Sequence, residues 1–189
     1  MGVSGLHANS VAPVLVSREQ GRRKSSFCRA LMPDVLARYY TDNLKLTSQG
    51  QAERMLAEMG MLNMDEFDKY AESKMPLLKN LMQMSVLNIR KAYQQNFGQL
   101  PRIASFIGTS NRFDLLTDPT GSRRFLCIEV KHDIDCTGIE HDRIFAQLKA
   151  ELIAGRRSWF TKSEEEELQR HNEAFYRVSL AEEAVRSLF

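Results

Sequence analysis

Short apolar runs alternate with longer stretches of helical periodicity along most of this chain. VAPVLVS (residues 11–17) is apolar and rich in β-branched residues, which is typical of a strand buried on both faces. A helix is predicted from Lys24, and Pro33 should end it and open a second helix, because proline suits a first helical turn. Further strands are predicted at residues 42–46, 61–64 and 125–130, and further helices at residues 48–59 and 74–84.

The second half of the chain changes from extended to helical character. Residues 87–111 predict two extended segments joined by a polar turn at residues 94–98. Beyond Lys131, apolar residues recur at helical spacing up to Gly155, and two capping-box patterns mark further helix starts. The spacing is that of Ile144, Leu148 and Leu152, and the caps pair Ser163 with Glu166 and Ser179 with Glu182.

Strands that alternate with helices predict the α/β class, with a mainly parallel central sheet flanked by helices. We expect residues 1–131 to form the core and residues 132–189 to form a C-terminal helical segment of the same domain. The length of 189 residues suits one globular domain.

Composition narrows the class of protein without giving a function. The net charge of +2 does not by itself indicate a nucleic-acid binder. The three cysteines form no C-x-x-C pair, so a reduced, cytoplasmic protein is favoured over a disulfide scaffold or a zinc site. No apolar run is long enough to span a membrane, and the N-terminus reads as the cut edge of a longer chain rather than a signal peptide.

The first stretch whose residues could form a functional site is REQGRRKSSF (residues 18–27). Lys24 and Ser25 follow a buried strand and precede a helix, which is the context of a phosphate-binding loop. There the lysine would neutralise phosphate oxygens and the serine hydroxyl would ligate Mg²⁺. The pattern G-x-x-x-x-G-K-S/T requires glycine at positions 18 and 23, and both hold arginine. Taken alone, the stretch is better explained as a basic turn that caps a helix.

The second candidate stretch is the acidic pair that follows MLNM (residues 61–64). Asp65 and Glu66 come directly after an apolar strand, as in a Walker B motif. The aspartate would hold Mg²⁺ and the glutamate would polarise the attacking water. The alternative is an exposed acidic strand end, which the position weakens because open α/β sheets bind ligands at the carboxyl ends of their strands.

Two further polar positions complete the series. Asn111 ends the predicted strand ASFIGTSN and could sense a γ-phosphate and orient water, although asparagine also favours turns. Arg123 and Arg124 follow a predicted type I turn at residues 118–121, and either could stabilise charge on a transferring phosphoryl group, in its own subunit or a neighbour. Two solvated arginines are the alternative. All four features occur in the order that one nucleotide site requires.

With these motifs, the chain resembles the virulence-associated protein E (VirE-type) family of P-loop ATPases of phage and mobile-element replication, which is related to superfamily-three helicases and AAA-type ATPases. The matching segments include NMDEFD (residues 63–68) and PRIASFIGTSN (residues 101–111), and the most specific of them is LLTDPTGSRRF (residues 115–125). The resemblance extends over nearly the whole chain.

The resemblance implies a helicase-like ATPase that uses ATP and Mg²⁺ to act on single-stranded or duplex DNA. By position, Gly21, Lys24 and Ser25 match the ATP-binding loop. Asp65 and Glu66 match Walker B, and Asn111 matches the sensor. Arg123 or Arg124 matches the arginine finger, which related proteins supply to a neighbour in a homo-oligomeric ring. Full-length members usually carry N-terminal, often primase-like, sequence that is not present here.

The resemblance also implies a DNA-binding hairpin. In superfamily-three helicases a hairpin before the sensor strand reaches DNA, and Arg90 and Lys91 lie on its first arm here. Tyr93 and Phe97 nearby would suit backbone contact with base stacking. Packing at a subunit interface is an equal alternative.

The departure from the family pattern is confined to the loop, at Arg18 and Arg23. A left-handed conformation at either position would cost a residue with a Cβ about 1–2 kcal/mol. The side chain would then either obstruct the phosphates or, for Arg22 or Arg23, bind them directly. Two rival functions follow: a nucleotide- or DNA-binding scaffold with little turnover, and another P-loop enzyme such as a kinase.

Overall fold

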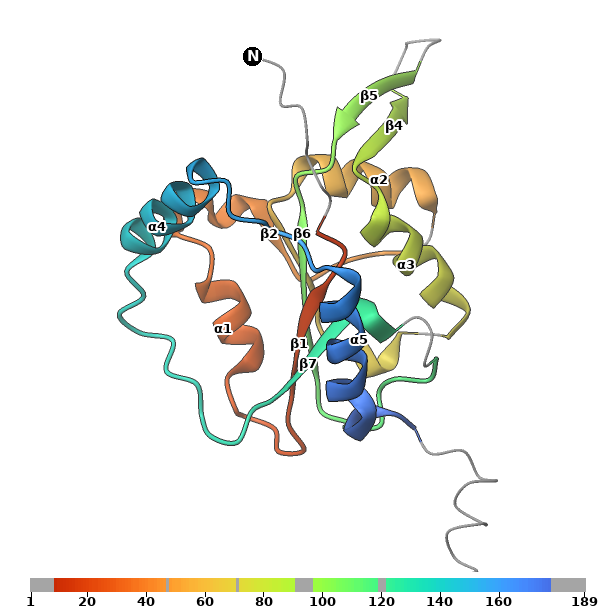
Figure 1. Cartoon of the computed structure of the whole chain (residues 1–189), viewed down its shortest axis with the longest axis vertical. Coiled ribbons are helices and arrows are strands. Elements are labelled where there is room, and N and C mark those ends of the chain that lie inside the picture. The colour runs from red at the N-terminus through yellow and green to blue at the C-terminus, as the bar shows by residue number, and fades with distance from the viewer. Residues whose placement is uncertain (1–8, 47, 71, 91–96, 119–121, 178–189) are drawn as a thin grey trace, which may run out of the picture.

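The computed structural model describes residues 9–46, 48–70, 72–90, 97–118 and 122–177. Its centre is a five-stranded sheet with the order β2-β3-β6-β1-β7, in which every neighbouring pair is parallel (Figure 1). The strands are β1 (Ala12–Val16), β2 (Tyr40–Thr41), β3 (Met61–Met64), β6 (Ser105–Ser110) and β7 (Phe125–Glu129). The predicted α/β class with a mainly parallel sheet is therefore confirmed.

Helices cover both faces of this sheet (Figure 1). The α-helices are α1 (Lys24–Ala30), α2 (Gln49–Glu58), α3 (Met75–Gln83), α4 (His141–Ile153) and α5 (Lys162–His171). Short 3₁₀ segments are η1 (Asp34–Tyr39), η2 (Phe67–Lys69), η3 (Glu72–Lys74), η4 (Ser122–Arg124) and η5 (Asn172–Phe175). The helices predicted from Lys24, at residues 48–59 and at residues 74–84 correspond to α1, α2 and α3.

Alternate residues of β1 face two cores of unequal size. Val14 and Val16 belong to the larger cluster, which includes Leu56 of α2 and Leu78 of α3. Leu15 points the other way into a small cluster with Cys28 of α1 and Ile107 of β6. Apolar burial thus fixes α1, and the loop that precedes it, against one face of the sheet.

Two predictions after α1 differ from the structure. Residues 42–46 form no strand, and the sheet continues instead through β2 at Tyr40–Thr41. Leu44 and Leu46 are buried in the larger core, which produces a strand-like alternation without a hydrogen-bonded ladder. The helix expected after Pro33 is the 3₁₀ segment η1.

The region predicted as two extended segments contains three strands. β4 (Val86–Arg90) and β5 (Phe97–Pro101) form a separate antiparallel pair that projects beside α2, and β6 follows in the central sheet (Figure 1). The turn predicted at residues 94–98 is wrong at its end, because Phe97 and Gly98 pair with β4. Residues 91–96, including Lys91 and Tyr93, lie outside the described residues.

The C-terminal helices return to the sheet. Thr161, rather than Ser163, caps α5: its hydroxyl accepts from the Glu164 N–H, and the Glu164 carboxylate accepts from the Thr161 N–H. The predicted box was displaced by two residues because a run of four glutamates offers several equivalent registers. The second predicted box, at Ser179, lies outside the described residues.

Buried Asn172 then ties this segment to β7. Its amide donates to the carbonyl oxygens of Ser122 and Phe125, and its Oδ1 accepts from the Cys127 N–H at 3.2 Å.

Candidate functional site

An open cleft of about 420 Å³ lies at the carboxyl edge of the sheet, where β1, β3 and β6 end. Parallel strands direct their carboxyl ends to the same edge, so loops far apart in sequence meet there. The lining comes from residues 20–26 after β1, from Asp65 and Glu66 after β3, and from Thr109 and Asn111 at the end of β6.

Lys24 lies at the base of this cleft. The side chain is buried, with the residue only 7% exposed, and its Nζ donates to Ser17 Oγ at 2.6 Å and to Asn111 Oδ1 at 2.8 Å. Burial lowers the pKa of Lys24, and the negative charges of Asp65 and Asp68 partly oppose that shift. The ammonium is therefore held between the ends of β1 and β6 by two neutral oxygen atoms.

Asp65 joins the three segments that line the cleft. Its Oδ1 accepts hydrogen bonds from Ser25 Oγ at 2.7 Å and from Thr109 Oγ1 at 2.6 Å. Thr109 Oγ1 in turn accepts from the Glu66 N–H at 3.3 Å. The hydroxyl of Ser25 and the carboxylate of Asp65 are oxygen donors of the kind that Mg²⁺ takes from proteins.

These donors fit a magnesium ion that is shared with a ligand. Among the described residues, no group of three or more His, Cys, Asp or Glu side chains is placed to hold a metal ion. Mg²⁺ is commonly bound by one or two carboxylates together with substrate phosphates. Ser25 and Asp65 match that arrangement rather than an all-protein cage.

Backbone strain is concentrated at the same cleft. Within the described ranges, the non-glycine residues with positive φ are Arg23, at 61°, and Glu66, at 50°. Both line the cleft, and strained residues of this kind cluster at functional sites. Gly21 also has a positive φ, of 83°, but Arg18 does not. Of the two positions where glycine is expected, only position 23 therefore requires the left-handed conformation.

The arginines of the loop have different surroundings. The Arg18 guanidinium lies over the Phe113 ring, 5.3 Å from its centroid. Arg22 pairs with Glu19 and, at 2.9 Å, with Asp133. The hydrogen bond to Asp133 is the main cause of the raised pKa of Arg22. Its guanidinium is therefore already occupied by two carboxylates.

A segment that follows β7 holds the loop from outside. The Ile134 N–H donates to the Arg22 carbonyl at 3.3 Å, and Cys136 Sγ lies 4.0 Å from the Arg23 carbonyl oxygen as a weak donor. Ile134 also packs on the small core beneath α1. Residues 133–136, called the strap below, thus fix the loop in its strained form.

Glu66 is exposed, unlike Lys24 and Asp65 in the same cleft. Half of its side chain is exposed, and its carboxylate pairs with Lys69 at 2.6 Å. Exposed ion pairs of this type contribute about 0.2–1 kcal/mol, so the pair can open at little cost.

The structure separates Arg123 and Arg124 from this cleft. They form η4, which precedes β7, and Phe125 at the start of β7 pairs with Ala12 at the start of β1. They therefore lie at the amino edge, roughly 15 Å or more from the carboxyl edge across a five-residue strand. Arg123 pairs with Glu165 at 3.5 Å, while Arg124 Nε is buried and has no hydrogen-bond partner among the described residues.

Two predicted features are outside what the structure describes. Arg90 ends β4, but Lys91 lies beyond the described residues, so the proposed DNA contact of the hairpin stays a prediction. Of the turn predicted at residues 118–121, only Asp118 is described, and it pairs with Lys79 at 2.7 Å.

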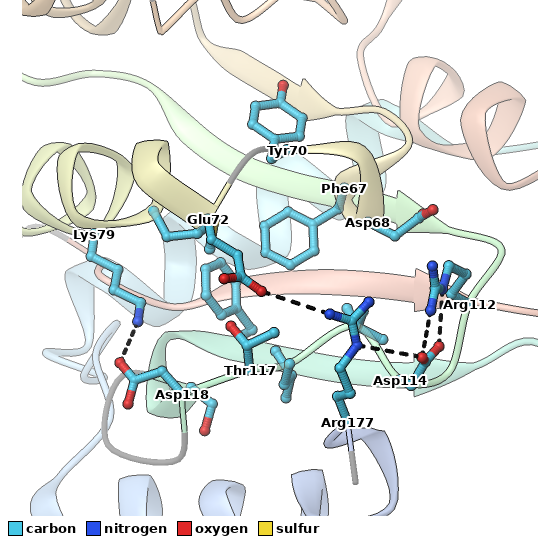
Figure 2. A pocket seen from close by; sticks show the side chains of 15 residues that line it. Phe67, Asp68, Tyr70, Glu72, Lys79, Arg112, Asp114, Thr117, Asp118 and Arg177 are labelled. Atoms are coloured by element: carbon cyan, nitrogen blue, oxygen red, sulfur yellow. Dashed lines mark hydrogen bonds and ion pairs between the residues drawn. The ribbon is translucent and has the colours of Figure 1, made fainter. Parts of the chain in front are cut away.

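A second, narrower pocket of about 70 Å³ lies between α3 and the loop after β6 (Figure 2). Its charged side chains are paired with one another: Lys79 with Asp118, Arg112 with Asp114, and Arg177 with Glu72 and Asp114. Asp68, on its rim, accepts a hydrogen bond from Ser110 at 2.8 Å. This pocket therefore supports the end of β6, beside Asn111, rather than offering free charge to a ligand.

Sequence reasoning missed the parts played by Ser17 and Thr109. Each is buried; Thr109 bonds to Asp65, which is remote in sequence, and Ser17 bonds to Lys24 across the loop that joins β1 to α1. The pairing of Thr109 depends on sheet register and that of Ser17 on the path of the loop, and the sequence gives neither. The usable signal for Thr109 was its place at the tip of an apolar strand beside the strand that ends in Asp65.

The comparison with protein families gives one match over most of the chain: residues 5–177 match the virulence-associated protein E-like domain. No curated protein matches the sequence. Within the described ranges, no helix is both long and apolar enough to cross a membrane.

Solved structures of the NrS-1 C terminal region are similar in fold. One apo structure shares 16% identity with a TM-score of 0.51, covering 96% of this chain and 43% of that chain. Two A form apo structures share 18% and 16% identity, with TM-scores of 0.48 and 0.49. These two matches cover 93% and 96% of this chain, and 38% and 43% of the length of those chains. This chain thus spans about two-fifths of the structures that it matches.

Proposed function

Since this chain belongs to the virulence-associated protein E-like domain family, we propose that the cleft at the carboxyl edge is the ATP site of a P-loop ATPase. The proposed work is helicase-like and coupled to DNA, in the replication of a phage or mobile element. One observation carries the proposal: Lys24, Ser25, Asp65 and Asn111 come from three separate segments and are joined by hydrogen bonds around one cleft.

In the proposed complex, the loop binds the triphosphate. The Lys24 ammonium exchanges its hydrogen bonds to Ser17 and Asn111 for phosphate oxygens, which releases the Asn111 side chain. The Ser25 hydroxyl and the Asp65 carboxylate hold Mg²⁺, which supplies positive charge against the phosphate oxygens. Thr109 keeps the Asp65 carboxylate oriented.

For hydrolysis, Glu66 acts as the general base and Asn111 orients the attacking water. Opening of the exposed Glu66–Lys69 pair frees the base. Arg123 or Arg124 stabilises the transition state of a neighbouring subunit in a ring. That assignment is supported by their position at the edge of the sheet opposite their own cleft.

The test is MgATP-dependent phosphate release, with and without single-stranded and duplex DNA, for the natural sequence and for Glu66→Gln. We expect DNA-stimulated release that falls by about 10²–10⁴-fold in Glu66→Gln, the usual contribution of a general base. Glu58→Gln is a matched control, since Glu58 is an exposed acid near the end of α2. Equal background rates in all three proteins would refute the ATPase proposal.

A second candidate is a nucleotide- or DNA-binding scaffold with little turnover. The Glu66–Lys69 ion pair favours it, because the carboxylate must leave Lys69 before it can accept a proton as the general base. The scaffold predicts MgATP binding together with phosphate release that does not depend on Glu66.

A further inference from the structure

We propose that Arg23 binds the phosphates of the nucleotide directly. Its guanidinium then donates hydrogen bonds to the phosphates from the loop position where a glycine is expected. This inference rests on the proposed function, since it concerns the same cleft. Its starting point is a left-handed arginine that lines the cleft immediately before Lys24.

The surroundings of the three loop arginines single out Arg23. Arg18 stacks on Phe113 and is not part of the lining of the cleft. Arg22 is held by Glu19 and Asp133. Arg23 is exposed, lines the cleft, and forms no ion pair with any described residue, and its charge lowers the pKa of Asp135 in the strap less than the hydrogen bonds from Thr137 do. It is therefore the loop arginine whose donors are open to a ligand.

The charge of the cleft points the same way. Lys24 and Asp65 carry opposite charges, while the charges of Glu66 and Arg22 are matched by Lys69 and by the acids that hold Arg22. Without Arg23 the lining would therefore carry no net positive charge to attract a triphosphate. Arg23 supplies that charge, and its planar fork of N–H groups suits bidentate contact with phosphate.

The backbone explains why the arginine and its strain occur together. The Arg23 carbonyl accepts from the Phe27 N–H at 2.8 Å in the first turn of α1, which fixes its orientation. The strap holds Arg22 and Arg23 from the other side. A glycine would adopt this conformation without strain. The Arg23 side chain must therefore have a role that outweighs the cost of the strained backbone.

The experiment combines calorimetric titration with MgATP and the unfolding temperature of the free protein, for Arg23→Gly and Arg23→Ala. We expect each to weaken MgATP binding by about tenfold or more, as for loss of a charge-assisted hydrogen bond. Arg23→Gly should also raise the unfolding temperature, because it removes the left-handed strain. Affinity and stability then change in opposite directions, which a purely structural role would not produce.

Arg18→Gly is the matched control, since it removes the same charge and adds the same residue type within the loop. We expect its affinity to stay within about twofold of the natural sequence, because Arg18 does not line the cleft. MgATP affinity of Arg23→Gly equal to or tighter than that of the natural sequence would overturn the inference and leave the proposed function intact. Absence of MgATP binding by the natural sequence would instead overturn both.

Discussion

At the scale of single residues, the cleft depends on oxygen atoms that are already satisfied by one another. One carboxylate oxygen of Asp65 accepts from both Ser25 and Thr109, and Thr109 also accepts from the Glu66 backbone. Buried polar groups in such a network are costly to leave unpaired. In the absence of a ligand, the arrangement of the side chains in the cleft therefore depends on Thr109 as much as on Asp65 and Glu66.

Thr109→Val should destabilise the protein by about 1–3 kcal/mol, because it removes a donor to Asp65 and the acceptor of the Glu66 N–H. Thr109→Ser keeps the hydroxyl and should recover most of that loss. Urea unfolding of the two variants measures the difference. If Thr109→Val is as stable as Thr109→Ser, the hydroxyl does not support the cleft.

Lys24 predicts a pH dependence of stability. Burial lowers its pKa in the folded protein below the usual value of 10.5, so the unfolded chain binds more protons between the two pKa values. Stability from this residue therefore rises with pH through that window, below 10.5. The unfolding free energy of the natural sequence relative to Lys24→Met should increase toward alkaline pH. A difference that is flat with pH would show that burial does not penalise the charged lysine.

At the scale of elements, α1 and the strap each carry a cysteine, and the two differ in accessibility. Cys28 lies on the fully buried face of α1, and burial raises the pKa of its thiol to about 12. Burial likewise raises the pKa of the Cys127 thiol in β7 to about 12. Cys136 in the strap is only partly buried.

A thiol reagent should therefore label Cys136 in the folded protein and all three cysteines after unfolding, since buried thiols resist ionisation. Cys136→Ser should abolish the labelling of the folded protein. Labelling of Cys28 at the rate of Cys136 would mean that α1 is not held on the sheet as described. The count of reacted thiols under native conditions is the measurement.

Much of the fold could be predicted because apolar runs and helical stripes define β1, β3, β6, β7 and most of the helices. The gathering of Lys24, Asp65 and Asn111 was predictable too, since parallel strands present their carboxyl ends at one edge. The strand expected at residues 42–46 was wrong because alternating burial of Leu44 and Leu46 does not require a ladder. Contacts that depend on sheet register, such as Thr109 with Asp65, have no signature in local sequence. The same is true of the contacts between the strap and the loop.

At the scale of the whole molecule, the candidate groups are divided between opposite edges of one sheet. Lys24 and Asp65 lie at the carboxyl edge, and Arg123 and Arg124 lie at the amino edge. In the proposed function a second copy of the chain completes the site. This agrees with the amphipathic helix α4, which has no buried residue and whose apolar side chains, such as Leu148 and Leu152, are exposed.

The decisive experiment on the proposed ATP site is a titration of this chain with ATP, with and without Mg²⁺, alongside Lys24→Ala. We expect saturable binding that requires Mg²⁺, because in the proposed function Ser25 and Asp65 would share the ion with the phosphates. It also predicts loss of that binding in Lys24→Ala, which removes the cation at the base of the cleft. Absence of binding, or equal binding by Lys24→Ala, would contradict the claim that this cleft holds a nucleoside triphosphate.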